Sequence, residues 1–164
     1  MILLFWDASA LIKRYFPEEG SDIADALFAI AQPHKMLTCP WGYAETYSLL
    51  VRRWNERVLN DAAFNTAVTA LRNEVVDGLR FDFLPITDIT IFESISITKK
   101  HSLNATDAAI LQMLTAYAEQ QKPTNTCVLI ASDRRFLRAA NNEGLKTLNP
   151  QMATAADIQS LLSP

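Results

Sequence analysis

The sequence predicts an α/β fold of three layers, α/β/α, in which a central, mainly parallel sheet of four to five strands lies between helices. Two short, strongly apolar segments, residues 2–6 and 126–131, have the composition of strands buried on both faces. Segments with helical periodicity alternate with strand candidates along the chain. Because parallel neighbours need long crossover connections, which helices supply, this alternation favours a parallel sheet covered on both faces.

In the first half of the chain, capping and breaking residues mark the element boundaries. The expected strands are residues 2–6 and 36–39, and the expected helices are residues 9–15, 21–31, 40–55 and 60–77. Ser21 and Asn60 are favoured N-caps of the second and fourth helices. Pro33 ends the second helix, and Pro40 lies at the first position of the third, where proline is favoured.

The second half continues the alternation with one weaker strand. The expected strands are residues 83–86, 126–131 and 146–148, and the expected helices begin at residues 87, 106, 133 and 154. Thr87 caps the first of these helices, and Gly144 ends the third. Pro85 has no backbone N–H, which confines the 83–86 strand to a sheet edge.

Length and composition are typical of a single globular domain spanning residues 1–164, with 49% hydrophobic and 20% charged residues. The net charge of −3 lacks the basic excess of proteins that coat nucleic acid, so a nucleic-acid partner would be held by local patches. Cys39 and Cys127 lie in apolar surroundings, which favours core positions in a reducing cytoplasm. The apolar opening is too short for a signal peptide or a membrane span. We therefore expect a cytoplasmic protein with no membrane segment.

Four acidic residues follow or begin the predicted elements where parallel α/β folds place their sites, beyond the carboxyl ends of the strands. Asp7 follows the first strand, Glu45 lies early in the helix after the second, Asp107 opens a helix, and Asp133 follows the 126–131 strand. Each acid alone is explained as a helix cap or as a favourable charge at a helix N-terminus. If the sheet gathers all four, however, capping does not explain the set.

Four carboxylates in one cleft favour divalent-metal chemistry. Like charges within about 4–6 Å raise one another's pKa values and destabilise the fold, and a cation removes that penalty. Hard Mg²⁺ or Mn²⁺ prefers such oxygen ligands and retains several waters. A bound ion lowers the pKa of a water and neutralises charge on a phosphodiester. The pattern therefore predicts phosphodiester hydrolysis.

Three segments carry a family resemblance. Residues 7–13 (DASALIK), 105–110 (ATDAAI) and 131–136 (ASDRRF), with Glu45 in a helix after a strand, resemble the four acidic motifs of PIN-domain nucleases along nearly the whole chain. In length and pattern the sequence is most similar to the VapC-type toxin ribonucleases of toxin–antitoxin pairs. The resemblance implies a metal-dependent endoribonuclease that acts on RNA, forms a homodimer and is inhibited by a small antitoxin. It also implies that Asp7, Glu45, Asp107 and Asp133 bind the Mg²⁺ or Mn²⁺ ion.

Further residues near the acids are candidates for substrate binding or support. They are Ser9, Lys13, Thr106, Ser132, Arg134 and Arg138. Ser9 matches the small hydroxyl residue of the family and would hold a metal-bound water or a phosphate. Thr106 has either this role or that of a helix N-cap. Lys13 is a phosphate candidate. Arg134 and Arg138 share one helix face, which either grips the RNA backbone or is simply solvated.

Two other groups of residues have competing interpretations. Three arginines flanking Trp54, at positions 52, 53 and 57, suggest an RNA surface, but Trp54 belongs to an apolar helical stripe and so favours a core or dimer contact. The two histidines, His34 and His101, would serve a metal-free ribonuclease as acid and base. Both are expected at the surface instead.

Three alternatives to a toxin ribonuclease remain open on the sequence. A phosphatase would use Asp7 as nucleophile, but it usually needs a second acid two residues later, where Ser9 lies. A non-catalytic PIN-like binding module is possible because fold alone does not determine function. A housekeeping RNA-processing nuclease has the same chemistry as a toxin, and an adjoining antitoxin reading frame would distinguish the two.

Overall fold

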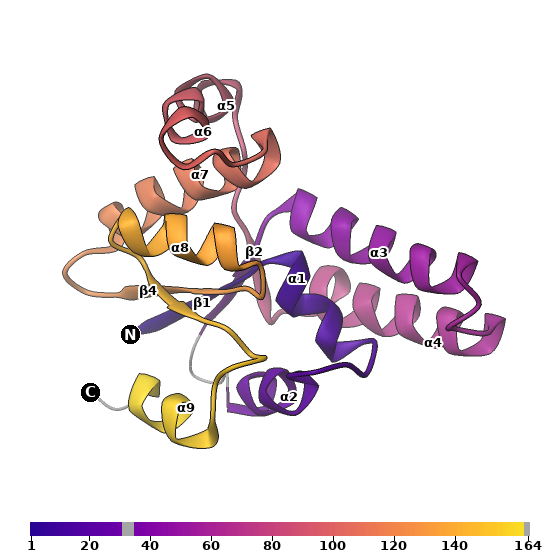
Figure 1. Ribbon diagram of the computed structural model, residues 1–164. Helices are drawn as coiled ribbons and strands as arrows, with labels where there is room; N and C mark the ends of the chain where they lie inside the picture. The colour runs from indigo at the N-terminus through magenta and orange to yellow at the C-terminus, as the bar shows by residue number, and fades with distance from the viewer. Residues whose placement is uncertain (31–34, 163–164) are drawn as a thin grey trace.

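The computed structural model describes residues 1–30 and 35–162, and it confirms the predicted three-layer α/β/α fold (Figure 1). In the described part of the chain the sheet has five strands, all parallel, in the order β3-β2-β1-β4-β5. The strands are β1 (Ile2–Trp6), β2 (Lys35–Thr38), β3 (Phe81–Phe83), β4 (Thr126–Ile130) and β5 (Lys146–Leu148). The first strand of the sequence is therefore the central one, as its apolar composition predicted.

Helices cover both faces of the sheet (Figure 1). They are α1 (Ala8–Leu11), η1 (Ile12–Arg14), α2 (Ser21–Ile30), α3 (Pro40–Asn55), α4 (Asp61–Leu71), η2 (Arg72–Asp77), α5 (Asp88–Glu93), α6 (Ile95–His101), α7 (Ala105–Gln121), α8 (Arg134–Asn142) and α9 (Ala155–Leu162). Side chains alternate between faces along a strand, so Leu3 and Phe5 pack with α7 and α8, whereas Leu4 and Trp6 pack with α1, α2 and α9. Both faces of β1 are buried.

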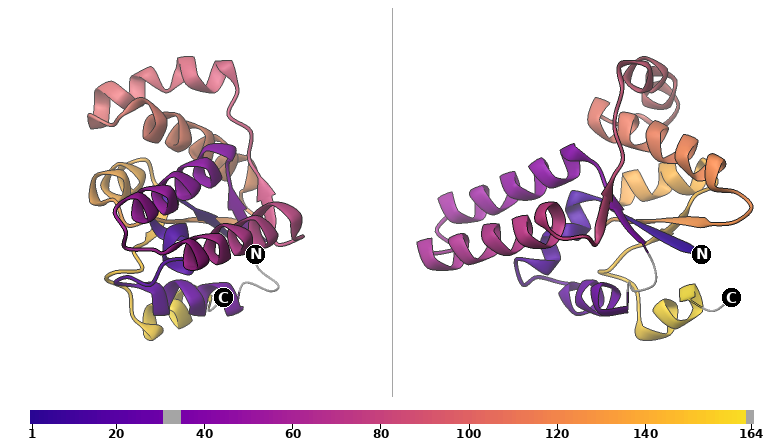
Figure 2. Two further views of the ribbon diagram at one scale, coloured as in Figure 1. Left: turned by 90° about the vertical axis from the view of Figure 1, so that its right-hand side faces the viewer. Right: turned by 180° about the vertical axis from the view of Figure 1, so that it is seen from behind.

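Helices α3 and α4 lie side by side and extend away from the sheet (Figures 1 and 2). The Trp54 ring stacks on Phe64 of α4, with a centroid distance of 5.0 Å. Trp54 is still 40% exposed, whereas Leu50 on the same predicted stripe is fully buried. The structure therefore contradicts the core position for Trp54, because the ring stays partly exposed on a neighbouring helix. The dimer contact and the RNA surface stay predictions.

Several predicted boundaries were wrong, most by a single residue, and two of them bear on the sheet edge and on the site. The strand expected at 83–86 is β3 (Phe81–Phe83), because beyond it only Leu84 continues the pairing, donating its N–H to the Thr38 carbonyl at 2.8 Å, before Pro85. The helix expected from Thr106 begins at Ala105, and its N-cap is Asn104 rather than Thr106. The Asn104 side chain accepts the Asp107 N–H at 2.8 Å, as a favoured capping residue does.

Some predictions lie outside the described residues, namely the end of the second helix at 31, Pro33 and His34. Cys39 and Cys127 are buried free thiols, as expected for core positions. Across residues 1–30 and 35–162, no helix combines the length and the apolar character that crossing a bilayer requires.

Candidate active site

The parallel register brings the ends of three strands together. Phe5 of β1 pairs with Leu37 of β2, and Trp6 pairs with Ile130 of β4, so the chain leaves all three strands at one edge of the sheet. Asp7, Glu45, Asp107 and Asp133 line one cavity of about 330 Å³ at this edge, here called the acid pocket. Its other lining residues are Ala8, Ser9, Ser48, Leu49, Arg52, Asn104 and Phe136. Four segments that are distant in sequence therefore contribute to one pocket.

Asp7 is the most buried of the four acids, with 6% of its surface exposed. Its Oδ2 accepts hydrogen bonds from the Ser9 N–H, at 2.9 Å, and from the Ser9 hydroxyl. The Ser9 Oγ in turn accepts the Ser132 N–H at 2.9 Å. Ser9 therefore connects the segment after β1 to the segment after β4, and it orients the carboxylate of Asp7.

Glu45 reaches the pocket because α3 begins very close to β1 and β2. A Cβ atom on Gly42, in the first turn of α3, would lie 2.6 Å from Thr38 Oγ1. That hydroxyl is buried and donates to the Trp6 carbonyl at 3.0 Å. The absence of a side chain at Gly42 thus lets the helix approach, and Glu45 follows three residues later on the same side.

Helix N-termini hold the remaining two acids. Asn104 caps α7, and its Nδ2 donates to Asp107 Oδ2 at 2.9 Å. Asp133 caps α8, with Oδ1 accepting the N–H groups of Arg135 and Phe136 at 2.8 and 2.9 Å. Within the described residues, the second oxygen of each carboxylate makes no hydrogen bond. Each acid is therefore fixed by one oxygen and offers the other as a ligand.

Burial and mutual repulsion raise the pKa values of three of the acids. Burial raises the pKa of Asp7, against the hydrogen bonds from Ser9 and with a further contribution from the charge of Asp133. Burial and then the charges of Asp7 and Asp107 raise the pKa of Glu45. Burial and then the charges of Asp7 and Asp133 raise the pKa of Asp107 to about 6, although Arg135 opposes this. The pocket has more negative charge than its own residues neutralise.

The donor set fits a hard divalent cation. Carboxylate oxygens line the pocket together with hydroxyl and amide groups, and no cysteine or histidine is among the lining residues. Mg²⁺ and Mn²⁺ prefer such ligands and keep several waters. Among the described residues, no three acidic, histidine or cysteine side chains converge closely enough to form a closed metal site. The carboxylates therefore surround the pocket rather than meet at one point.

The structure places the other predicted residues less close to the acids. Lys13 is buried, and its Nζ pairs with Glu18 Oε1 at 2.5 Å. Thr106 is not an N-cap and does not line the acid pocket. Arg134 and Arg138 are exposed and lie outside the pocket lining. The charge of the intervening Arg135, instead, acts on Asp107.

Asn104 was missed in the sequence, and Arg52 was considered only as part of a surface around Trp54 and not as a residue of the pocket. Asn104 had a local signal, because an asparagine three residues before Asp107 is a favoured N-cap. Arg52 lies seven residues after Glu45, a spacing that places both on one helix face. The expectation that His101 lies at the surface was wrong, because its side chain is 7% exposed and Nε2 contacts Glu143 Oε1 at 2.5 Å.

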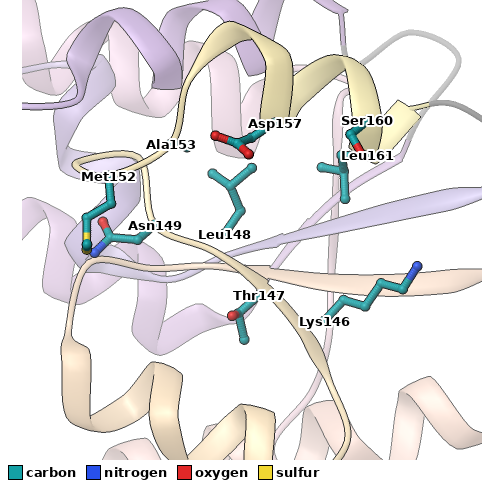
Figure 3. A pocket seen from close by; sticks show the side chains of 9 residues that line it. All are labelled: Lys146, Thr147, Leu148, Asn149, Met152, Ala153, Asp157, Ser160 and Leu161. Carbon is teal, nitrogen blue, oxygen red and sulfur yellow. The ribbon is translucent and has the colours of Figure 1, made fainter.

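A larger cavity, of about 470 Å³, lies between β5 and α9 (Figure 3). Its lining includes one carboxylate, Asp157, which accepts the N–H and hydroxyl of Thr154 at 2.7 Å each. Lys146 is the only basic residue among those that line it. This cavity therefore gathers no set of acidic or nucleophilic groups comparable to the acid pocket.

Comparisons with known proteins agree with this fold. The model of the PIN domain family matches residues 4–142. The structure is similar to that of PAE2754 from Pyrobaculum aerophilum, with a TM-score of 0.61, 16% identity and coverage of 92% of this chain and 93% of the other. It is also similar to that of FitAcB from Neisseria gonorrhoeae, with a TM-score of 0.59, 19% identity and coverage of 93% and 100%. A comparison with curated protein sequences found no match. Because the family model covers most of the chain, the protein belongs to the PIN domain family.

Proposed function

We propose that this protein is a Mg²⁺- or Mn²⁺-dependent endoribonuclease that hydrolyses RNA phosphodiester bonds in the acid pocket. PIN domains are in general nucleases, which supports a hydrolase acting on phosphodiester bonds. The observation that carries the proposal is that Asp7, Glu45, Asp107 and Asp133, from four distant segments, line one cavity. A binding module without metal would gain nothing from gathering these charges.

The residues of the pocket have distinct parts in this mechanism. Asp7, oriented by Ser9, and Asp107, oriented by Asn104, present fixed carboxylate oxygens as ligands. Asp133 is held by backbone N–H groups, and Glu45, half-buried on α3, completes the set. When bound, the divalent ion would supply a water of lowered pKa and neutralise the charge that develops on the phosphate. The hydrogen bonds hold the ligands in place before substrate arrives.

We further propose that the enzyme acts in the cytoplasm as the toxin of a toxin–antitoxin pair and assembles as a homodimer. The support is the similarity of its acidic motifs to VapC-type toxins and the fold shared with FitAcB. A short antitoxin reading frame next to the gene is expected. Coexpression with its product should suppress growth arrest caused by the protein alone. A strain that encodes the protein without an adjoining antitoxin gene and still grows would instead favour an RNA-processing nuclease.

Cleavage of RNA by the purified protein tests the proposal directly. We expect cleavage with Mg²⁺ or Mn²⁺, none with a chelator, and none for Asp7→Asn or Asp107→Asn in folded protein. Asp25→Asn is a matched control, because this aspartate pairs with Arg14 at the surface, outside the acid pocket, and should leave activity unchanged. Cleavage that survives chelation and both substitutions would contradict the proposal. Loss only on His101→Ala would indicate a metal-free mechanism.

A further inference from the structure

A second cavity, here called the side pocket, adjoins the acid pocket. It has a volume of about 390 Å³. Ser9, Leu49 and Asp133 line both cavities, so the two are compartments of one groove divided at these residues. The side pocket therefore begins at the carboxylates that the proposed reaction uses.

Helix α3 forms one wall of both compartments. Glu45, Ser48, Leu49 and Arg52 line the acid pocket, at the spacing of a single helix face. Leu49 and Arg53 line the side pocket. Neighbouring arginines, Arg52 and Arg53, thus belong to different compartments of one groove.

The side chains of the two arginines differ in the contacts that they make. Arg52 is exposed, and its side chain has no ion pair or hydrogen bond within the described residues. Arg53 lies 3.8 Å from Glu18 and 3.4 Å from Glu56 and is 40% exposed. Its guanidinium also lies over the Phe16 ring, 5.2 Å from the centroid. Ion pairs at this exposure contribute little, so an incoming phosphate can replace them.

The side pocket also contains an unsatisfied polar group. Ser132 lines it, and its Oγ is buried without a hydrogen-bond partner among the described residues. Lys13 in the same lining is buried and pairs with Glu18, which leaves Arg53 as the accessible cation there. A buried hydroxyl without a partner is unusual in a native protein and indicates a missing ligand or water.

We propose that the side pocket is a subsite for the nucleotide next to the scissile bond of the RNA substrate. Arg53 contacts the phosphate of that nucleotide, and Arg52 holds the strand at the acid pocket. Ser132 becomes a second donor once its buried hydroxyl turns toward the cavity. The inference rests on the proposed ribonuclease function and assigns it a binding subsite.

Neutral linkages in a short RNA substrate test the contact with Arg53. A methylphosphonate is placed, in two separate substrates, at the linkage on the 5′ side and on the 3′ side of the scissile bond. In the substrate whose neutral linkage faces the side pocket, the KM of the wild type should rise about tenfold, with kcat little changed. Arg53→Gln should raise the KM for unmodified RNA by a similar factor. In this variant the methylphosphonate should no longer change the KM. Arg53→Lys, which keeps the charge, should recover part of the affinity. Arg57→Gln is the matched control, because Arg57 lines neither compartment.

Ser132→Ala gives an independent readout. Because the hydroxyl has no partner in the protein, its loss should leave thermal stability unchanged or slightly higher while it raises KM. An Arg53→Gln enzyme with an unchanged KM, or one in which the methylphosphonate effect persists, would overturn the inference. Absence of cleavage by the wild type on any RNA would overturn the proposed function itself, and the subsite with it.

Discussion

Burial of the Asp7 carboxylate destabilises the folded protein near neutral pH when no cation is bound. Asp7 is almost fully buried, and its charge also raises the pKa values of Glu45 and Asp107. A carboxyl group whose pKa is raised by folding is more readily ionised in the unfolded chain. The residues proposed to bind a cation therefore oppose folding without one, a common trade between stability and activity.

This conflict predicts how stability depends on pH. A raised carboxyl pKa contributes stability below the unfolded value, about 3.9 for aspartate. That stability is lost as the pH rises through the folded value, which is about 6 for Asp107. In the presence of chelator, the Tm should therefore fall as the pH is raised from about 5 to about 8, and Mg²⁺ should reduce the fall. Thermal unfolding followed by circular dichroism measures this dependence.

Asp7→Asn separates charge from shape in the same experiment. Asparagine keeps an oxygen that accepts the Ser9 hydrogen bonds but carries no charge. The variant should have a higher Tm than the wild type at about pH 8 in chelator, with a weaker pH dependence and no stabilisation by Mg²⁺. Equal pH profiles for the two proteins would show that the acid cluster does not destabilise the fold.

Asn104 orients a proposed metal ligand and also caps a helix, and a second asparagine separates these roles. Asn60 caps α4 by accepting the Ala63 N–H at 2.8 Å and is not among the residues that line the acid pocket. Asn104→Ala and Asn60→Ala should each lower the free energy of unfolding by about 1 kcal/mol. Only Asn104→Ala should also reduce cleavage, because Asp107 loses its Nδ2 partner. Equal activity of the two variants would assign Asn104 a capping role alone.

At the scale of elements, the placement of α3 depends on the missing side chain of Gly42. A methyl group there would meet the buried Thr38 hydroxyl, which cannot rotate away without losing its bond to Trp6. Overpacking of this kind costs typically about 1–3 kcal/mol. Gly42→Ala should therefore destabilise the protein by this amount and, by shifting Glu45, lower the cleavage rate. Chemical denaturation and the RNA assay measure the two effects.

Gly144→Ala is a useful control for Gly42→Ala. Gly144 follows α8 with φ of +82°, and a Cβ there would meet no atom within 4 Å. Alanine at this position should cost about 1–2 kcal/mol through backbone strain alone. Because no helix is displaced, the cleavage rate should be kept at temperatures where the variant is folded. A similar loss of activity in both variants would mean that reduced stability, rather than the position of α3, limits cleavage.

Elements with strong local signals were predictable from the sequence. The apolar 2–6 segment identifies the strand β1, and Pro40 marks the first residue of α3. Helix caps such as Thr87 follow from short-range hydrogen bonds. The strand β3 was displaced because three residues at a sheet edge have a weak pattern and depend on pairing with β2. Asn104 was overlooked because Thr106, also a capping residue, lies two positions later.

The candidate site was predictable in its acids and less so in its surroundings. Each acid follows a strand or begins a helix, and the carboxyl ends of parallel strands meet at one edge. The partners of Lys13 and His101 were not predictable, because a pattern of residue types does not show which charges meet in space. Glu143, for example, lies 42 positions from His101. The subdivision of the groove by Leu49 likewise depends on how α3 packs.

At the scale of the whole molecule, an apolar surface remains uncovered on α5 and α6, which lie outside α7 (Figure 2). Ile89, Phe92 and Ile95 are mostly exposed, and α5 has no buried residue. Exposed apolar patches of this kind mark interaction surfaces or aggregation risks in soluble proteins. Together with the similarity to VapC-type toxins, this surface makes α5 and α6 the expected interface of the proposed homodimer.

A charge in this surface should separate the subunits. Phe92 is 74% exposed, so Phe92→Asp removes apolar contact area without disturbing the core of the monomer. In a dimer interface the aspartates would lie desolvated and close to their symmetry mates, which costs several kcal/mol. We expect the wild type to have the mass of a dimer by light scattering, and Phe92→Asp that of a monomer with an unchanged circular dichroism spectrum. Met152→Asp, at an exposed apolar residue between β5 and α9, should remain dimeric. A monomeric wild type, or dissociation by Met152→Asp alone, would show that α5 and α6 do not form the interface.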